Sequence, residues 1–158
     1  GHAPCERVLR EGRVAVDPLD LREAARKGDA TALEGLIRAG GKRIVNANDS
    51  LGQTALYAAA SNGHVALIKI LFEAGADPNQ ATINGEVALH GAAAHGHVEA
   101  CEALIAGGAV INKRRSDSMA PLHVACSFGH ADVALALAKA GADINLQEKY
   151  GRTPMHFA

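Results

Sequence analysis

Residues 119–145 read MAPLHVACSFGHADVALALAKAGADIN, and this stretch decides the fold because the chain returns to it at a fixed interval. Equivalent residues recur every 33 positions. The clearest series are Leu56, Leu89, Leu122 and Met155; His64, His97 and His130; Gly75, Gly108 and Gly141; Asn46, Asn79, Asn112 and Asn145; and Gly52, Gly85 and Gly151 with Ser118 between them. A repeat of this length indicates a supersecondary unit that buries its apolar face only by stacking on neighbouring copies.

The unit at 49–81 shows what each repeat encodes. Thr54 is an N-cap candidate for a short helix at 55–60, and Gly63 ends this helix in a left-handed turn. A second helix is predicted from Val65 to Ala74, with a broad apolar face and Gly75 at its end. Residues 76–85, with Pro78 and Gly85 as turn residues, predict a hairpin-like connection. Both helices are shorter than the roughly 12–15 residues at which an isolated helix becomes marginal, so each unit depends on its neighbours.

Composition fits a thin stack of helices better than one broad core. Aromatic residues make up 3% of the chain, and the first helices are rich in alanine, which lets helices lie close together. An apolar fraction of 48% with little net charge excludes disorder. The near balance of 16 Lys and Arg against 17 Asp and Glu gives no indication of nucleic-acid binding. No stretch approaches the roughly 20 apolar residues that cross a bilayer, so we expect no membrane insertion.

Three cysteines, at 5, 101 and 126, form no Cys-x-x-Cys pair and leave an odd count. They indicate neither a disulfide framework nor a zinc ribbon. A reducing compartment is the simpler interpretation, so we expect an intracellular protein of the cytoplasm and/or nucleus.

The repeated motifs resemble those of the ankyrin repeat family. Residues 119–126, followed by Gly129-His130 and by 141–145, match the Thr-Pro-Leu-His-x-Ala-Ala, Gly-His and Gly-Ala-Asp-x-Asn signatures, apart from Ala120 for Thr and Cys126 for Ala. The resemblance covers residues 17–158 and implies an all-α solenoid of stacked helix-turn-helix units joined by hairpin-like loops. We place the units at 17–48, 49–81, 82–114, 115–147 and 148–158.

The two ends of the chain depart from the regular unit. Glu23 and neighbouring charges in the unit at 17–48 give the polar outer face expected of a capping repeat. The first connection, Gly41 to Val45, is two residues longer than its counterpart and basic, and we expect it to be a loop. Residues 1–16 have no repeat counterpart and form either a short helix or a loose tail. The unit at 148–158 stops inside its first helix, so we expect a fragment of a longer array or a chain whose C-terminal end is disordered.

Two residue groups resemble chemical sites. His90, His95 and His97 lie close enough in sequence to suggest shared zinc, but His90 and His97 recur with the repeat. In the resembled family these histidines hydrogen-bond neighbouring backbone, which implies a structural role here. Cys126 lies three residues after His123, yet it takes the place of Ala60, and we expect it to pack as a small apolar residue. We therefore predict no catalytic site, no metal site and no cofactor.

In the resembled family the concave face, formed by the loop tips and the exposed side of each first helix, binds proteins. We take the following residues at those positions as the candidate protein-binding site: Leu51, Gln53, Asn62, Ile83, Glu86, His95, Arg114, Arg115, Met119, Phe128, Tyr150 and Arg152. Leu51, Ile83, Met119, Phe128 and Tyr150 are apolar or aromatic where the repeat requires nothing apolar. Packing of Met119 and Phe128 on adjacent tips is the alternative explanation for those two residues.

Basic residues gather at the last two loops, where Lys113, Arg114, Arg115, Lys149 and Arg152 lie. We expect a monomer that binds a protein or peptide with apolar anchors and acidic residues. The predicted function is a non-catalytic interaction module, an adaptor or scaffold. The alternative is a recognition domain of a larger enzyme, ubiquitin-ligase receptor or ion channel.

Overall fold

The computed structural model describes residues 16–158. The expectation for residues 1–16 therefore falls, except for Val16, outside the described residues. The described helices are α2 (Pro18–Lys27), α3 (Ala30–Gly40), α4 (Lys42–Val45), α5 (Ala55–Ser61), α6 (Val65–Glu73), α7 (Ala88–Ala94), α8 (Val98–Ala106), α9 (Pro121–Ser127), α10 (Ala131–Lys139) and the 3₁₀ helix η1 (Pro154–His156). Within this part of the chain, no helix has the length and hydropathy to cross a membrane.

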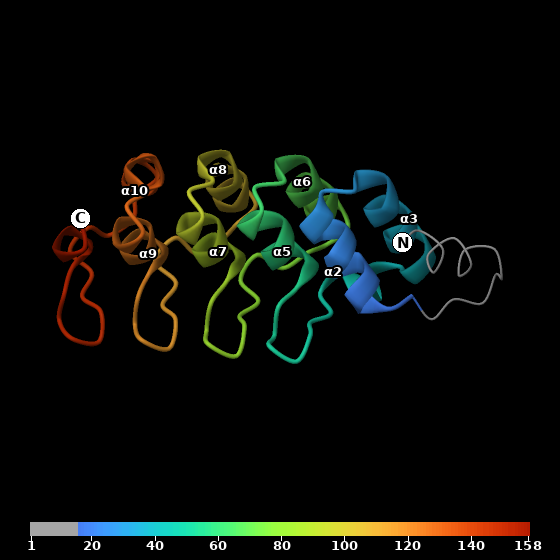
Figure 1. Cartoon of the computed structure of the whole chain (residues 1–158), viewed down its shortest axis with the longest axis horizontal. Coiled ribbons are helices and arrows are strands. Elements are labelled where there is room, and N and C mark those ends of the chain that lie inside the picture. The colour runs from blue at the N-terminus through green and yellow to red at the C-terminus, as the bar shows by residue number, and fades with distance from the viewer. Residues whose placement is uncertain (1–15) are drawn as a thin grey trace.

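The helices form two parallel rows (Figure 1). One row contains α2, α5, α7 and α9, the other contains α3, α6, α8 and α10, and the loops between units project to one side. Each first helix packs on its own partner helix and on the first helix of the next unit. The structure is thus the predicted all-α solenoid of stacked units.

Buried leucines hold the stack together. Leu56, Leu89 and Leu122 hold the same place in α5, α7 and α9, and all three are buried beside fully buried alanines such as Ala59 and Ala92. This packing confirms the prediction that alanine makes room for close helix contact. Met155, the fourth member of the leucine series, is exposed.

Helix ends agree closely with the sequence predictions. The Thr54 hydroxyl accepts a hydrogen bond from the backbone N–H of Tyr57 at 3.1 Å, which confirms Thr54 as the N-cap of α5. Gly63 has a φ of +72°, the predicted left-handed turn. The first connection differs from its prediction, because residues 42–45 form the one-turn helix α4 with Val45 buried against the stack. The two extra residues therefore build a helical turn, and the expectation of a loop there is wrong.

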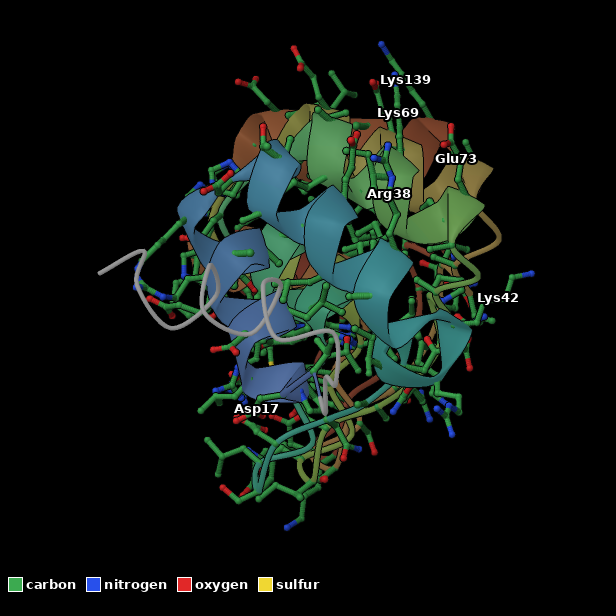
Figure 2. All side chains as sticks on the ribbon, turned by 90° about the vertical axis from the view of Figure 1, so that its right-hand side faces the viewer. Asp17, Arg38, Lys42, Lys69, Glu73 and Lys139 are labelled. Atoms are coloured by element: carbon green, nitrogen blue, oxygen red, sulfur yellow. The ribbon has the colours of Figure 1, made fainter. Side chains whose placement is uncertain are left out.

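Four hairpin-like loops each lead into the first helix of the following unit. We name them the second (47–53), third (80–86), fourth (113–119) and fifth (146–152) hairpins, after the unit that each one opens. They lie side by side along one edge of the molecule (Figure 1). The helices α3, α6, α8 and α10 form the opposite edge, where Arg38, Lys69, Glu73 and Lys139 project away from the hairpins (Figure 2).

Candidate functional site

The tips of neighbouring hairpins are hydrogen-bonded to one another. The carbonyl of Leu51 accepts from the N–H of Ile83 at 3.0 Å, and the carbonyl of Asn84 accepts from the N–H of Ser116 at 2.9 Å. The same bond joins Asp117 to Lys149 at 3.2 Å. This ladder fixes the tips relative to one another. We call the continuous edge formed by residues 50–51, 83–84, 116–117 and 149–150 the tip surface.

Large apolar side chains project from the tip surface. Leu51, Ile83 and Tyr150 are 51%, 66% and 73% exposed. Exposure of this extent at three of the four tips, those of the second, third and fifth hairpins, marks a surface suited to contact with another molecule. Gln53, on the returning limb of the second hairpin, is half-buried.

Met119 does not belong to this surface. Its side chain is 8% exposed and its sulfur lies 3.3 Å from Nη2 of Arg115. The returning limb of the fourth hairpin turns this residue inward against the stack, so the prediction that Met119 offers an apolar anchor is wrong. Met119 does pack, as the alternative held, but in the core and against Arg115 of its own hairpin rather than on an adjacent tip.

The ends of the first helices provide a second row of candidates. The side chain of Asn62 donates to the carbonyl of Ala58 at 2.8 Å, and Nδ1 of His95 lies 2.9 Å from the carbonyl of Gly91. Phe128 holds the same place after α9, but its ring cannot satisfy a carbonyl and is 62% exposed. The packing alternative therefore does not apply to Phe128, which stays available for contact.

Three of the four hairpins are closed by an acceptor side chain at their first turn. Oδ1 of Asp49 accepts from the N–H groups of Leu51 and Gln53 at 2.9 and 2.8 Å. Thr82 in the third hairpin and Glu148 in the fifth accept from the corresponding pairs of N–H groups. These residues satisfy the backbone of their own loops, as short polar side chains commonly do in turns.

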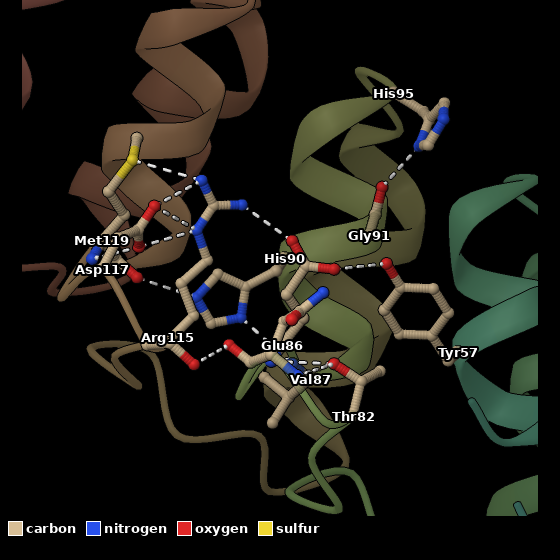
Figure 3. A network of polar contacts seen from close by, with 12 residues as sticks. Tyr57, Thr82, Glu86, Val87, His90, Gly91, His95, Arg115, Asp117 and Met119 are labelled. Atoms are coloured by element: carbon tan, nitrogen blue, oxygen red, sulfur yellow. Dashed lines mark hydrogen bonds and ion pairs between the residues drawn. The ribbon is translucent and has the colours of Figure 1, made fainter. Parts of the chain in front are cut away.

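The fourth hairpin reverses this arrangement, because Arg115 takes the acceptor's place and a guanidinium accepts no hydrogen bond. Asp117 substitutes for the missing acceptor, with Oδ1 3.1 Å from the N–H of Met119. Nη1 of Arg115 lies 2.7 Å from Glu86, and Nη2 lies 2.8 Å from Asp117 (Figure 3). A cleft of about 310 Å³ lies between the third and fourth hairpins beside these charges.

Tyr57 extends this network to the second unit. Its hydroxyl donates to the second carboxylate oxygen of Glu86 at 2.9 Å (Figure 3). The equivalent histidines, His90 and His123, instead place Nε2 3.1 and 3.2 Å from the carbonyls of Met119 and Arg152 in the next unit. Between the second and third units, the contact of Tyr57 with the Glu86 side chain thus replaces the contact of a histidine with a backbone carbonyl that joins the later units. Because Glu86 also binds Arg115, it joins three units.

The network keeps its members in defined charge states. Burial opposes ionisation of Asp117, but hydrogen bonds from Arg115 and from the Met119 N–H outweigh it and lower the pKa of Asp117. Hydrogen bonding to Asp117 and Glu86 raises the pKa of Arg115. Burial and the neighbouring Glu86 carboxylate raise the pKa of Tyr57 to about 12. At neutral pH Asp117 is therefore a carboxylate, Arg115 a guanidinium and Tyr57 a neutral phenol.

The predicted basic cluster is smaller than the sequence indicated. Arg115 is paired within the network, and Nε of Arg152 lies 3.2 Å from the buried carboxylate of Glu148. Arg114 donates to the carbonyl of Gln147 and keeps its charge at the surface. Lys149 and Arg152 flank the ring of Tyr150, 5.7 and 5.4 Å from its centroid.

The repeated histidines hold units together. Nε2 of His64, His97 and His130 lies 2.9 to 3.1 Å from a carbonyl of the preceding unit. Burial lowers the pKa of His90, whose two ring nitrogens contact Val87 N–H and the Met119 carbonyl. These contacts confirm the structural role. Residues 16–158 contain no group of three or more side chains arranged to hold a metal ion.

Neither described cysteine has the character of a nucleophile. Cys101 is fully buried in the core, and burial raises the pKa of its thiol to about 12. Burial also raises the pKa of Cys126, which packs on the core as predicted. A raised pKa disfavours the thiolate form, which agrees with a packing role for Cys126.

Sequence reasoning missed the network around Glu86. It selected Glu86 and Arg115 as separate contact residues and did not connect them with Tyr57. Aligning the units by their period shows the signal: an arginine stands where other units have Asp49, Thr82 and Glu148, and Tyr57 stands in the histidine series. Two such exchanges, in the units on either side of the one that contains Glu86, indicate a compensating contact.

The geometry of stacked units with projecting hairpins agrees with a comparison against known families. A family model described as ankyrin repeats (three copies) matches residues 21–115 and 89–158. The chain belongs to the ankyrin repeat family. Repeats of this family are generally protein-interaction modules.

Ankyrin repeat proteins with further regions are among the similar curated sequences. The bovine and human proteins named Ankyrin repeat and SOCS box protein 3 are 38% identical over 84 residues, covering 49% of this chain and 16% of each relative. The mouse protein named Inactive serine/threonine-protein kinase TEX14 is 36% identical over 84 residues, covering 52% of this chain and 6% of that protein. The matched part is thus a small share of the length of these relatives.

Proposed function

We propose that this chain is a non-catalytic protein-interaction module, an adaptor or scaffold element that binds a protein or peptide segment along the tip surface and the adjoining first-helix ends. The observation that carries the proposal is the set of exposed apolar side chains at Leu51, Ile83 and Tyr150 on the tips, together with the exposed Phe128 at the end of α9. The repeat motif does not require apolar residues at these positions, and their exposure favours contact with a partner.

The partner's chemistry follows from what surrounds these side chains. Apolar groups of the partner contact the exposed tips, and acidic groups face Arg114 and Lys149, which stay at the surface. The chain acts as a monomer inside the cell, with neither nucleic acid nor membrane as its ligand.

A second candidate function places the same surface in a larger protein. The chain matches only 6 to 16% of the length of the kinase-like and SOCS-box relatives. In that case the repeats form the recognition region of a larger enzyme, ubiquitin-ligase receptor or ion channel, and the binding surface stays the same.

Selection of binding peptides from a random display library tests the proposal. The chain is immobilised, and the affinity of selected peptides is measured by calorimetry for the chain itself and for the double variant Ile83→Ser, Tyr150→Ser. The control is Leu135→Ser, because Leu135 is 56% exposed on the opposite edge, in α10. We expect the double variant to lose most of the affinity and the control to keep it. Selected peptides that bind all three chains equally would contradict the tip surface as the binding site.

A further inference from the structure

The two halves of the tip surface differ in charge. The second and third hairpins contain two charged residues, Asp49 and Glu86, and each is paired with an arginine, Arg22 or Arg115. The surface that these hairpins present to solvent therefore has no unpaired charged side chain, and Leu51 and Ile83 are its large apolar residues. This half of the tip surface favours apolar side chains of a partner.

The fourth and fifth hairpins contain five basic residues and two acidic ones. Both carboxylates already have partners within the chain. Asp117 is paired with Arg115, and Glu148, which is 5% exposed, accepts a hydrogen bond from its own loop. Arg114, Lys149 and Arg152 are exposed. This half presents an excess of positive charge around the ring of Tyr150.

From this division we infer that the partner is an extended protein segment with apolar side chains at one end and acidic side chains at the other. The apolar end lies over Leu51 and Ile83, and the acidic end lies at Lys149 and Arg114. The inference rests on the proposed function and adds the partner's charge pattern and its orientation along the repeats. Charge complementarity of this kind fixes register and excludes wrong partners more than it adds affinity.

The hydrogen-bonded ladder sets the spacing of the partner's two ends. Each step along the tips consists of one hydrogen-bonded residue pair, about 5.5 Å between Cα atoms, and one peptide unit of about 3.8 Å. Ile83 and Lys149 hold the same place in hairpins two units apart, so they are separated by roughly 18 Å. An extended chain covers that distance in about five or six residues.

Display selection with matched charge variants tests the inference. Peptides selected from a random 12-residue library on the chain are sequenced, and the affinity of the best peptides is measured against Lys149→Glu and Lys69→Glu. Lys69 is a matched control because it projects from α6 on the opposite edge (Figure 2). Both variants change charge at an exposed lysine, so thermal melts are expected to stay within a few degrees of the parent chain.

We expect selected peptides to carry an acidic residue about five or six positions from an apolar one. Lys149→Glu should weaken binding by about three- to tenfold, and Lys69→Glu should leave it unchanged. A spin label at the acidic end of the peptide should broaden the amide signals of Lys149 and Tyr150 and spare those of Leu51.

Two failures are distinguishable. If no peptide binds, or if the peptides bind the Ile83→Ser, Tyr150→Ser variant as tightly as the parent chain, the proposed function fails together with the inference. If peptides bind the tip surface but lack the apolar-acidic spacing, or if Lys149→Glu and Lys69→Glu have equal effects, the function stands and the inference is overturned.

Discussion

The fourth and fifth hairpins have residues of opposite charge, Arg115 and Glu148, at the same repeat position in their first turn. In the fifth hairpin the buried carboxylate of Glu148 accepts from two N–H groups of its own loop, and a glycine, Gly151, takes the left-handed conformation. In the fourth, Arg115 replaces the acceptor and Ser118 is left-handed at a φ of +66°. The fifth hairpin is therefore held mainly from within, whereas the fourth depends on Glu86 in the preceding unit. The difference shows that departures from the repeat are compensated across unit boundaries.

The largest effect is expected in the core, which both hairpins share. Leu122→Ala removes a buried side chain of α9, between the fourth and fifth hairpins, and should cost about 2–5 kcal/mol of unfolding free energy by leaving a cavity. Urea denaturation followed by circular dichroism measures this cost. A loss well below 1 kcal/mol would show that the two hairpins do not share a continuous core.

Removal of Arg115 should weaken the fourth hairpin and its contact with Glu86 in the third. Arg115→Ala leaves the Glu86 and Asp117 carboxylates without their cation, so we expect a loss of about 1–3 kcal/mol. The control Arg114→Ala changes an exposed arginine in the same hairpin and should stay within about 0.5 kcal/mol of the parent chain. Equal losses in both variants would contradict the network.

The fourth and fifth hairpins have serine and glycine, respectively, at the same left-handed position, and exchanging these residues tests how much each hairpin is strained there. Ser118→Gly relieves a left-handed serine and should stabilise the chain by up to about 1 kcal/mol. Gly151→Ser should destabilise it by about 1–2 kcal/mol, because a Cβ there meets no atom within 4 Å and the cost is purely conformational. Thermal melts of the two variants should shift in opposite directions. Shifts in the same direction would show that the hairpins tolerate this conformation equally.

The hydrogen bond from Tyr57 to Glu86 should contribute less to the free energy of unfolding than the ion pairs of Arg115 do. Tyr57→Phe removes one hydrogen bond to Glu86 and should cost about 0.5–1.5 kcal/mol. A double-mutant cycle with Arg115→Ala should show coupling, because both side chains bind the same carboxylate. Strict additivity would show that Glu86 does not join the three units.

Acidification should weaken the contact at the base of the fourth hairpin. Burial lowers the pKa of His90, so the unfolded chain binds a proton more readily than the folded chain does. The stability from neutral His90 is complete above its ordinary pKa of 6.5 and is lost as pH falls below that value. The parent chain should lose more stability between pH 7 and pH 5 than His90→Gln. Parallel pH profiles would exclude this linkage.

The repeat and its helices could be predicted from sequence because the period exposes residues under one common constraint. Thr54, Gly63 and the leucine series each recur at fixed places with a local physical role. The inward turn of Met119 and the pairing of Arg115 could not be predicted in the same way. Both depend on contacts of the fourth hairpin that recur in no other described unit. The period therefore marks Arg115 as an exchange but offers no second example of the contacts that either residue makes.

The tip surface was predicted as a set of positions, and its charge pattern required the structure. Arg115 and Arg152 count as basic residues in the sequence, but only the structure shows that Glu86 and Glu148 lie against them. The positive charge available to a partner is therefore concentrated at Arg114 and Lys149, beside an exposed Tyr150.

Amide chemical-shift mapping tests the central claim most directly. The ¹⁵N-labelled chain is titrated with a display-selected peptide, and shift changes are mapped onto the two edges of the molecule. The tip surface as binding site predicts changes at Leu51, Ile83, Lys149 and Tyr150, with the amides of Lys69 and Lys139 unchanged. Changes confined to the helical edge around Lys69 and Lys139 would contradict it.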